Sequence, residues 1–571
     1  MKLSKLVIAA AAVAACASSL STSAFAQAKE QFFPLLSYRT GPYAPNGTPW
    51  ANGKQDYIKM INARDGGING VKIAFEECET GYATDRGVEC YERLKSRPGV
   101  AMFDPQSTGI TFALTEKAPA DKIPLMTLGY GLSVSQDGMA FKWNFPLMGS
   151  YWTGADILLQ HIGKGLGGMD KLKGKKVTLV YHDSPFGKEP IPLMQERAKM
   201  HGFELQMLPV TAPGVEQKAT WLQVRQSRPD YVLLWGWGVM NSTALKEAQA
   251  TGYPREKMYG VWWAGAEPDV RDVGEGAKGY HALALNGSGQ QPKVIQDILK
   301  NVHDKGQGTG PKDEVGSVLY TRGVIIQMLS IEAVRRAQER FGKGKVMTGE
   351  QVRWGMENLA LDQKKLDALG FNNVMRPIST SCADHMGSTW ARVQTWDGKK
   401  WDVGADWYQA DEQILKPMVK AGSEKYLADK KMTRRDAADC QSSGHPPEAL
   451  RAFPLLLQRY ALRKGDNASA AGRPLRGVPG LGRASYYRLC LQPPIERGAP
   501  QPFRLAKRRQ HNGLQKHRSE RQRHRGHIQP RDPRAQGCLA AGARGQHRRH
   551  PGRQWRRQDH HVARRLQPAQ G

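Results

Sequence analysis

Apolar and polar positions follow two recurring patterns between about residue 31 and residue 265. Short apolar runs such as "GVKIAFEE", "KKVTLVYHD" and "DYVLLWGWG" have the length and residue types of β-strands. Between such runs lie stretches with helical periodicity, among them "TDRGVECYERLKS", "GSYWTGADILLQHIGKGL" and "NSTALKEAQATGYP". Repeated strand–helix units at this spacing predict parallel sheets that are covered by helices on both faces.

The units form two successive series, each restarting with a fresh helix, which predicts an α/β fold of two similar, doubly wound lobes. The runs "VTLVY" and "YVLLW" are apolar throughout, as expected for strands buried on both faces. In such sheets ligands bind at the carboxyl ends of the strands. These ends are "FDPQSTG", "MTLGYG", "YHDSPFG", "WGWGVMN" and "WWAGAEP", so the functional surface is predicted at these five loops.

Residues 1–26 have the features of an export signal. Lys2 and Lys5 precede the apolar run "LVIAAAAVAACA", and "AFA" supplies the small residues that signal peptidase requires. This run is too short to span a membrane, and no later apolar run is long enough. "VAAC", which ends at Cys16, weakly resembles a lipoprotein box, but its leading valine departs from that pattern. We therefore expect a periplasmic protein without a lipid anchor at Cys16.

Four cysteines fall in the body of the chain: Cys78, Cys90, Cys382 and Cys440. Disulfides form in exported proteins, and the first two flank the loop "ETGYATDRGVE", so a local bridge is predicted there. Cys382 would then pair with Cys440. A zinc site is the alternative, but no pair has Cys-x-x-Cys spacing and no histidine is suitably placed. The prediction is two disulfides and no metal.

The segments "INARDGGINGVKIAFEECETGYATDRGVECYERL" and "PQSTGITFALTEKAPADKIPLMTLG" resemble the substrate-binding proteins of the branched-chain amino acid class of ABC importers. The resemblance covers roughly residues 31–440. It implies a type I periplasmic-binding-protein fold, whose two lobes are joined by three crossovers and close on a ligand like a Venus flytrap. It implies lobe I at residues 27–144 and 275–375, and lobe II at residues 145–274 and 376–440. The implied partners are a small-molecule ligand and the permease and ATPase subunits of an importer. No cofactor is expected, and the membrane is reached only through the permease.

In that family a Ser/Thr pair after the third strand binds the carboxylate of the ligand, and Ser107 and Thr108 occupy this position. A helix N-terminus attracts anions, although either residue could instead serve only as the N-cap. Gly129 and Tyr130 match the family's second carboxylate contact. Tyr130 is bulkier than the small residues usual there, which argues against a leucine-type ligand.

Aromatic residues gather at the other strand ends and at the first helix of lobe II. The residues predicted to face the ligand are Tyr151, Trp152, Trp235 and Trp262, and the neighbouring Trp237 and Trp263 lie at the same strand ends. Each alone could belong to the core, but together they favour a flat or apolar ligand body.

Two charged residues extend this prediction. Glu267 matches the acid that binds the ammonium group in amino-acid binders, with an ordinary loop acid as the alternative. Arg39 could reach an anionic ligand or be a surface cation. The predicted ligand is therefore a small carboxylate-bearing molecule, either an amino acid or an aromatic or branched acid.

Nothing in the sequence indicates catalysis. His182, Asp183 and Ser184 are adjacent in "HDSP", but adjacent residues cannot easily form a catalytic triad, and no "GxSxG" segment is present. "GKGLGG" and "GKGK" lack the P-loop pattern. We predict a binding protein rather than an enzyme, with a ligand-sensing receptor module of the same fold as the alternative.

The charge of the chain is concentrated at its C-terminal end. The formal charge is +30, and residues 441–571 hold 28 Lys and Arg against 6 Asp and Glu. Disorder and a nucleic-acid-binding arm are two interpretations of this composition. A third interpretation uses the genetic code. If the codons for "GRQWRRQDHHV" are read in a frame shifted by one base, they are compatible with the sequence Gly-Ala-Asn-Gly-Ala-Gly-Lys-Thr-Thr-Thr, which is a Walker A loop. We interpret residues 441–571 as a disordered tail translated out of frame from an adjacent ATPase gene, and expect no nucleic-acid binding.

Overall fold

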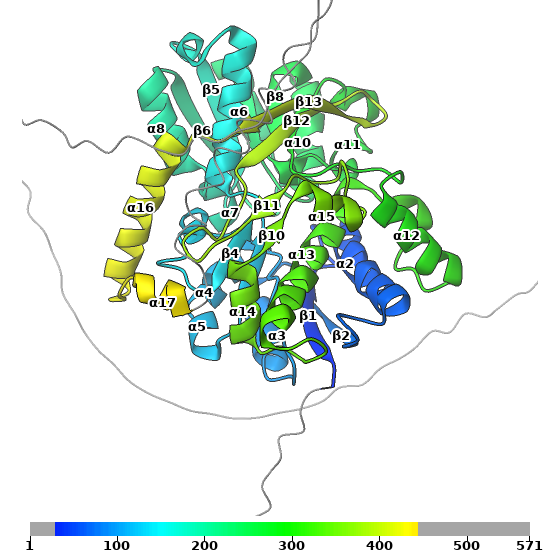
Figure 1. The fold of residues 1–571 in the computed structure, drawn as a ribbon. Coiled ribbons are helices and arrows are strands. Elements are labelled where there is room, and N and C mark those ends of the chain that lie inside the picture. Colours follow the sequence, from blue (N-terminus) through cyan, green and yellow to red (C-terminus); the bar gives the residue numbers. More distant parts are fainter. Residues whose placement is uncertain (1–28, 443–571) are drawn as a thin grey trace, which may run out of the picture. The chain divides into compact units, whose positions relative to one another are not determined.

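The structure is a computed structural model that describes residues 29–442. The predicted export signal, Cys16 and the arginine-rich tail beyond residue 442 lie outside the described residues. Through the described part, strands and helices alternate as the apolar pattern predicts (Figure 1). The strands form two main sheets, and we call the elements packed around them lobe I and lobe II.

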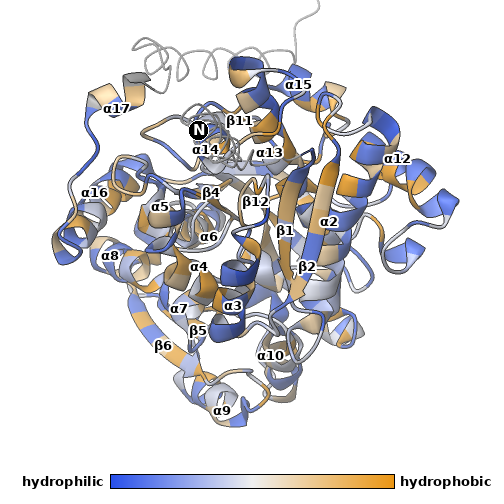
Figure 2. Ribbon diagram, turned by 90° about the horizontal axis from the view of Figure 1, so that it is seen from below, coloured by the Kyte–Doolittle hydropathy of each residue, from blue (hydrophilic) through white to orange (hydrophobic). Residues whose placement is uncertain are grey.

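The sheet of lobe I is parallel. Its strands are β1 (Gln31–Ser37), β2 (Ile73–Glu79), β3 (Leu125–Leu128) and β4 (Asn144–Leu147), paired as β1 with β2 and β3 with β4. Residues 100–104 lie between these pairs, because Val100 and Asp104 bridge to β1 while Phe103 bridges to β3. β1 is buried along its whole length and is coloured as hydrophobic in Figure 2.

The helices of lobe I surround this sheet. They are α2 (Ala44–Asp65), α3 (Thr84–Leu94), α4 (Thr108–Thr115), α5 (Ala118–Asp121), α12 (Lys293–Asn301), α13 (Val318–Phe341), α14 (Gly349–Glu357) and α15 (Gln363–Ala368). In α12 the buried positions are Val294, Ile295, Ile298 and Leu299, which gives the alternating colours of this helix in Figure 2. A stripe of this kind buries one face of a helix and leaves the other in water.

The sheet of lobe II has seven strands in the order β13-β12-β9-β8-β7-β5-β6. Its strands are β5 (Lys176–His182), β6 (Glu204–Val210), β7 (Tyr231–Trp235), β8 (Met258–Gly260), β9 (His281–Ala284), β12 (Trp390–Trp396) and β13 (Trp401–Gln409). The five strands from β5 to β9 are parallel, whereas β12 runs antiparallel both to β9 and to β13. The predicted α/β fold is confirmed, with a hairpin added at one edge of the second sheet.

Helices also cover the sheet of lobe II (Figure 1). They are α6 (Tyr151–Leu166), α7 (Pro185–Lys188), α8 (Ile191–His201), α9 (Lys218–Ser227), α10 (Val239–Ala250) and α11 (Glu267–Val270). Two further helices, α16 (Glu412–Asp429) and α17 (Ala437–Ser442), follow the β12–β13 hairpin in the chain, and α17 lies beside α5 and α14 (Figure 1). Two short strands, β10 (Ala360–Leu361) and β11 (Ile378–Ser379), pair antiparallel. β9 lies within the range 275–375 predicted for lobe I, yet it pairs with β8 of lobe II. The chain boundaries of the lobes otherwise stay a prediction.

Helices α2 and α13 cross at two glycines. A Cβ atom on Gly53 would lie 2.0 Å from the carbonyl oxygen of Tyr320, and one on Gly323 would lie 2.1 Å from the carbonyl oxygen of Trp50. Such distances are far below van der Waals contact, so only glycine allows the two backbones to approach this closely. The crossing fixes the position of Trp50, which reaches the site described below.

Both predicted disulfides are confirmed. Cys78 of β2 is bonded to Cys90 of α3, and Cys382 is bonded to Cys440 of α17. Among residues 29–442, no cluster of three or more His, Cys, Asp or Glu side chains is arranged to hold a metal ion. None of the helices in this range combines the length and the apolar character needed to cross a bilayer.

Candidate functional site

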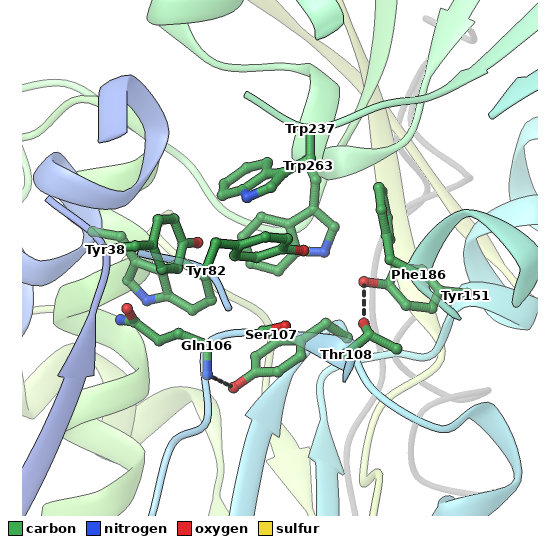
Figure 3. Close-up of a pocket in the computed structure, with 11 residues that line it drawn as sticks. Tyr38, Tyr82, Gln106, Ser107, Thr108, Tyr151, Phe186, Trp237 and Trp263 are labelled. Atoms are coloured by element: carbon green, nitrogen blue, oxygen red, sulfur yellow. Dashed lines mark hydrogen bonds between the residues drawn. The ribbon is translucent and has the colours of Figure 1, made fainter. Parts of the chain in front are cut away.

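A pocket lies between the two lobes, at the carboxyl ends of the strands. It is narrow and is lined by residues of both lobes (Figure 3). Lobe I contributes Tyr38, Trp50, Tyr82, Gln106, Ser107, Thr108 and Tyr130, and lobe II contributes Tyr151, Phe186, Trp237 and Trp263. The lining is therefore dominated by aromatic rings, with three polar side chains grouped together at the start of α4.

Ser107 and Thr108 form the polar side of the pocket. Ser107 is the N-cap of α4, and its Oγ accepts a hydrogen bond from the Ile110 N–H at 3.4 Å. Thr108 Oγ1 lies 3.2 Å from Tyr151 Oη, across the boundary between the lobes. Ser107 therefore caps the helix and also lines the pocket, and its role in binding a carboxylate stays a prediction. The positive end of the helix dipole and the unpaired N–H groups of the first turn make this side suited to an anion.

Two residues of the lining have left-handed backbone conformations. Tyr82 has φ of 64° and Gln106 has φ of 56°. For side chains other than glycine this conformation is strained by about 1 kcal/mol or more, and such strain is concentrated at functional sites. Here it turns the Tyr82 ring toward the pocket and presents Ser107 directly before α4.

Tyr130 organises the same side of the pocket from behind. Its Oη accepts a hydrogen bond from the Gln106 N–H at 2.7 Å and donates to the carboxylate of Asp104. Asp104 in turn accepts from Lys54 Nζ at 2.9 Å, and all of these groups are buried. The opposite charges of Lys54 and Asp104 cancel each other beneath the pocket. The bulky residue at position 130 thus lines the pocket and also holds the strained loop of Gln106.

Gly129 lies next to the pocket without lining it. Its carbonyl oxygen accepts hydrogen bonds from the indole N–H groups of Trp262 at 2.7 Å and Trp263 at 3.1 Å. Its φ of 70° is left-handed, and a Cβ atom there would lie 2.7 Å from Leu285 Cδ1. Gly129 therefore joins the lobes through its carbonyl group, at a position where only glycine fits.

Trp263 forms one wall of the pocket. It stacks on Trp50 with ring centroids 4.8 Å apart and meets Trp237 edge to face at 5.3 Å. The guanidinium of Arg322 lies 4.6 Å from the centre of the Trp263 ring, and Arg322 Nη1 donates to the carbonyl oxygen of Trp262 at 2.8 Å. Burial lowers the pKa of Arg322 to about 9. This arginine supports the wall and is not part of the lining.

Of the predicted aromatic contacts, Tyr130 and Tyr151 line the pocket, whereas Trp152, Trp235 and Trp262 pack behind it. Trp262 stacks on Tyr151 at 6.3 Å, and Trp235 meets Tyr151 edge to face at 6.0 Å. Trp152 donates from Nε1 to the carbonyl oxygen of Glu189. Trp237 lines the pocket in place of Trp235, and Trp263 lines it in place of Trp262.

Glu267 and Arg39 also lie outside the lining. The carboxylate of Glu267 accepts the backbone N–H of Val318 at 3.1 Å and so pairs with the first residue of α13. Burial raises the pKa of Glu267. Arg39 pairs with Glu77 and donates to Asn52 Oδ1 at 2.7 Å. Both side chains thus have partners within the fold, and the pocket lining itself contains no Asp, Glu, Lys, Arg or His.

Sequence reasoning did not single out five residues of the lining: Tyr38, Trp50, Tyr82, Gln106 and Phe186. Phe186 and Gln106 lie within loops already predicted to form the functional surface, so their neighbourhood was indicated. Tyr38 directly follows β1, at the carboxyl end of a strand, and could have been found by the same rule. Trp50 lies on a helix, and its position depends on the crossing of α2 and α13.

The adjacent His182, Asp183 and Ser184 do not form a triad. His182 shares hydrogen bonds of 2.8 Å with Tyr43 Oη and with Ser184 Oγ. Asp183 instead pairs with Lys188 on the surface. The carboxylate that would orient the histidine in a triad is therefore directed elsewhere.

Comparison with known proteins gives the context of this fold. The profile of the family described as "Periplasmic binding protein" matches residues 30–400. The Leu/Ile/Val-binding protein homolog 8 of Brucella abortus (strain 2308) is 28% identical over 261 residues, which is 44% of this chain and 62% of that protein. The chain thus spans about three fifths of the length of this curated relative.

Two solved structures are similar over a longer range. One, described as an ABC transporter permease from the Pseudomonas fluorescens group, is 39% identical with a TM-score of 0.67, covering 72% of this chain and 99% of that one. A branched-chain amino acid ABC transporter protein from Thermus thermophilus, solved with bound valine, has a TM-score of 0.58 at 22% identity, covering 69% of this chain and 100% of that one. At 22% identity, the similarity to the second structure shows a shared fold.

Proposed function

This chain belongs to the periplasmic binding protein family, and we propose that it is the extracytoplasmic solute-binding protein of an ABC importer. It captures a small carboxylate-bearing ligand between its lobes and delivers it in the closed form to a permease that works with an ATPase subunit. The predicted export signal supports a periplasmic location. The family consists of binding proteins, so the chain is not an enzyme.

One observation carries this proposal: Ser107 and Thr108, at the N-terminus of α4, lie in the same pocket as eight aromatic rings. A carboxylate placed there would receive hydrogen bonds from the hydroxyl groups and from the first-turn N–H groups of α4. The rest of a small ligand would be covered by the rings, which favour flat or apolar groups.

The lining favours an acid that has no amino group. An ammonium group buried in this pocket would need an anionic partner, because an unpaired buried charge is costly. Glu267, the residue predicted for this role, instead accepts the N–H of Val318. The name of the Brucella relative refers to branched-chain amino acids, whereas this pocket supports the corresponding acids without nitrogen.

Thermal unfolding with matched ligands tests the proposal. We expect 3-phenylpropionate or 4-methylpentanoate to stabilise the purified protein, by about 2.7 kcal/mol at a hundred times Kd. Phenylalanine and leucine differ from these acids only by the ammonium group, and 3-phenylpropanamide lacks the carboxylate. The Ser107→Ala variant should weaken binding, while Ser242→Ala, which removes a hydroxyl outside the lining, should not.

Each alternative result has a defined meaning. Binding of the amide as tightly as the acid would overturn the assignment of Ser107 and Thr108 to a carboxylate. Binding of the amino acids in preference to the acids would overturn the exclusion of an ammonium group. Stabilisation by no member of the panel would overturn the assignment of a plain hydrocarbon acid as the ligand.

A further inference from the structure

The pocket has a second group of polar atoms, separate from α4. Tyr38 Oη, Trp50 Nε1 and Trp237 Nε1 are buried and have no hydrogen-bond partner within the described residues. Tyr38 and Trp237 are neighbours, with ring centroids 6.2 Å apart at an interplanar angle of 80°. Figure 3 shows Trp237 on the side of the pocket opposite Ser107 and Thr108, with Tyr38 flanking the space between them.

The hydroxyl of Tyr38 is exceptional within this protein. Two other tyrosine hydroxyl groups of the pocket are paired, since Tyr130 donates to Asp104 and Tyr151 contacts Thr108. Among residues 29–442, Tyr38 is the one tyrosine whose buried hydroxyl has no partner. Indole N–H groups without partners also occur away from the pocket, for example in Trp354 and Trp401. The unpaired hydroxyl of Tyr38 is therefore stronger evidence for a contact with a ligand than the unpaired indoles are.

The chemistry of this hydroxyl is that of a donor. Burial raises the pKa of Tyr38 well above its usual value. The Trp237 indole N–H, which lowers this pKa, can only donate toward the Tyr38 oxygen and cannot accept the Tyr38 proton. Tyr38 therefore keeps its proton at neutral pH. A buried donor without an acceptor costs roughly 1–3 kcal/mol, and nearly all buried polar groups in proteins are paired. An acceptor is thus expected on whatever fills the pocket.

Two other kinds of ligand would leave this requirement unmet. A purely apolar tip would bury the hydroxyl without an acceptor. A quaternary ammonium group could lie against the rings through cation–π attraction, but it has no lone pair to accept a hydrogen bond. A group with a lone pair, most simply an oxygen, satisfies both the shape of the lining and its donors.

We propose that Tyr38 and Trp237 form a second polar subsite, which binds an oxygen acceptor at the end of the ligand remote from α4. The ligand class is a small acid that carries a second oxygen function, such as a hydroxyl, carbonyl or carboxylate group, on a flat or short apolar body. Tyr38 is then a specificity-determining residue, because it distinguishes this class from acids with a plain hydrocarbon end. This inference rests on the proposed function, in which α4 binds the carboxylate.

Binding of benzoate, 3-hydroxybenzoate and 4-hydroxybenzoate, measured by titration calorimetry on the purified protein, tests the inference. These probes share a carboxylate and a ring and differ only in the second oxygen. At least one hydroxybenzoate should bind about tenfold more tightly than benzoate, which is the size of one hydrogen bond. In the Tyr38→Phe variant this preference should fall below about twofold, because the hydroxyl that distinguishes the two kinds of acid is gone.

Tyr57→Phe is the matched control, because Tyr57 is buried in α2 but does not line the pocket. It should keep the preference of the parent protein. If benzoate binds as tightly as both hydroxybenzoates, or if Tyr38→Phe keeps the preference, the second subsite is overturned while the proposed function stands. If none of the acids binds, neither here nor in the panel above, the proposed function fails and this inference fails with it.

Discussion

Tyr43 Oη lies 2.8 Å from His182 Nε2, in a buried hydrogen bond that joins the loop before α2 in lobe I to the end of β5 in lobe II. The Tyr43 ring also packs against the pocket residue Tyr82, with centroids 4.4 Å apart. Beside it, the Val239 N–H donates to the carbonyl oxygen of Pro42 at 3.2 Å. The closed state is therefore held together next to the pocket by contacts that opening of the lobes would break.

This hydrogen bond predicts a pH dependence of ligand affinity. Burial lowers the pKa of His182 from 6.5 to about 4, so the closed form holds the neutral ring. We expect opening of the lobes to expose the histidine and to return its pKa toward its usual value. Its contribution to closure is therefore complete above about pH 6.5 and is lost as the pH falls toward 4. Kd should rise over this window, by up to about tenfold per pH unit from this group alone.

The test compares the pH profile of Kd for the parent protein, His182→Gln and His161→Gln. His161 also has a pKa lowered to about 4, but it packs against Tyr408 within lobe II. Asp269, which accepts from Asn46 of lobe I, acts in the opposite direction, since burial raises its pKa to about 6. The difference between the profiles of the parent and His182→Gln isolates the histidine. Identical profiles would show that His182 does not titrate with closure.

A second prediction concerns Glu267. Because its carboxylate accepts the N–H of Val318 and lies outside the lining, Glu267→Gln keeps an oxygen acceptor at the same place. We expect the Kd for any bound acid to change by less than about twofold. Calorimetric titration of the variant checks this value. A tenfold or greater loss confined to ligands with an ammonium group would instead place Glu267 in contact with the ligand.

The sequence predicted the fold better than it predicted the lining. Apolar runs and strand ends indicated the sheets, and the resemblance indicated the start of α4. Both features depend on residues that are close together in the sequence. The choice between Trp262 and Trp263 depends on the short turn after β8, where the direction of each ring is set by packing against Gly129 and Tyr151. Trp50 could not be predicted in this way, because it reaches the pocket through the crossing of α2 and α13, which are far apart in the sequence.

That crossing can be tested with Gly323→Ala. The added Cβ would lie 2.1 Å from the carbonyl oxygen of Trp50, so α2 and α13 must move apart. We expect a loss of roughly 1–3 kcal/mol of unfolding free energy, together with weaker ligand binding, because Trp50 supports the Trp263 wall. Gly165→Ala is the control, since nothing lies within 4 Å of its Cβ in α6, and it should stabilise by up to about 1 kcal/mol. Denaturant unfolding measures both. Equal stability of the two variants would contradict the close crossing.

The final prediction concerns Tyr38 in the absence of any ligand. Tyr280 Oη donates to the carbonyl oxygen of Ala264 at 2.8 Å, so Tyr280→Phe should lower the unfolding free energy by about 1 kcal/mol. Tyr38→Phe removes a hydroxyl that has no partner in the protein, and its unfolding free energy should stay equal to that of the parent or rise slightly. Thermal unfolding of the two variants without ligand makes the comparison. If Tyr38→Phe is destabilised as much as Tyr280→Phe, the hydroxyl of Tyr38 serves the fold, and the preference for a second oxygen on the ligand must have another origin.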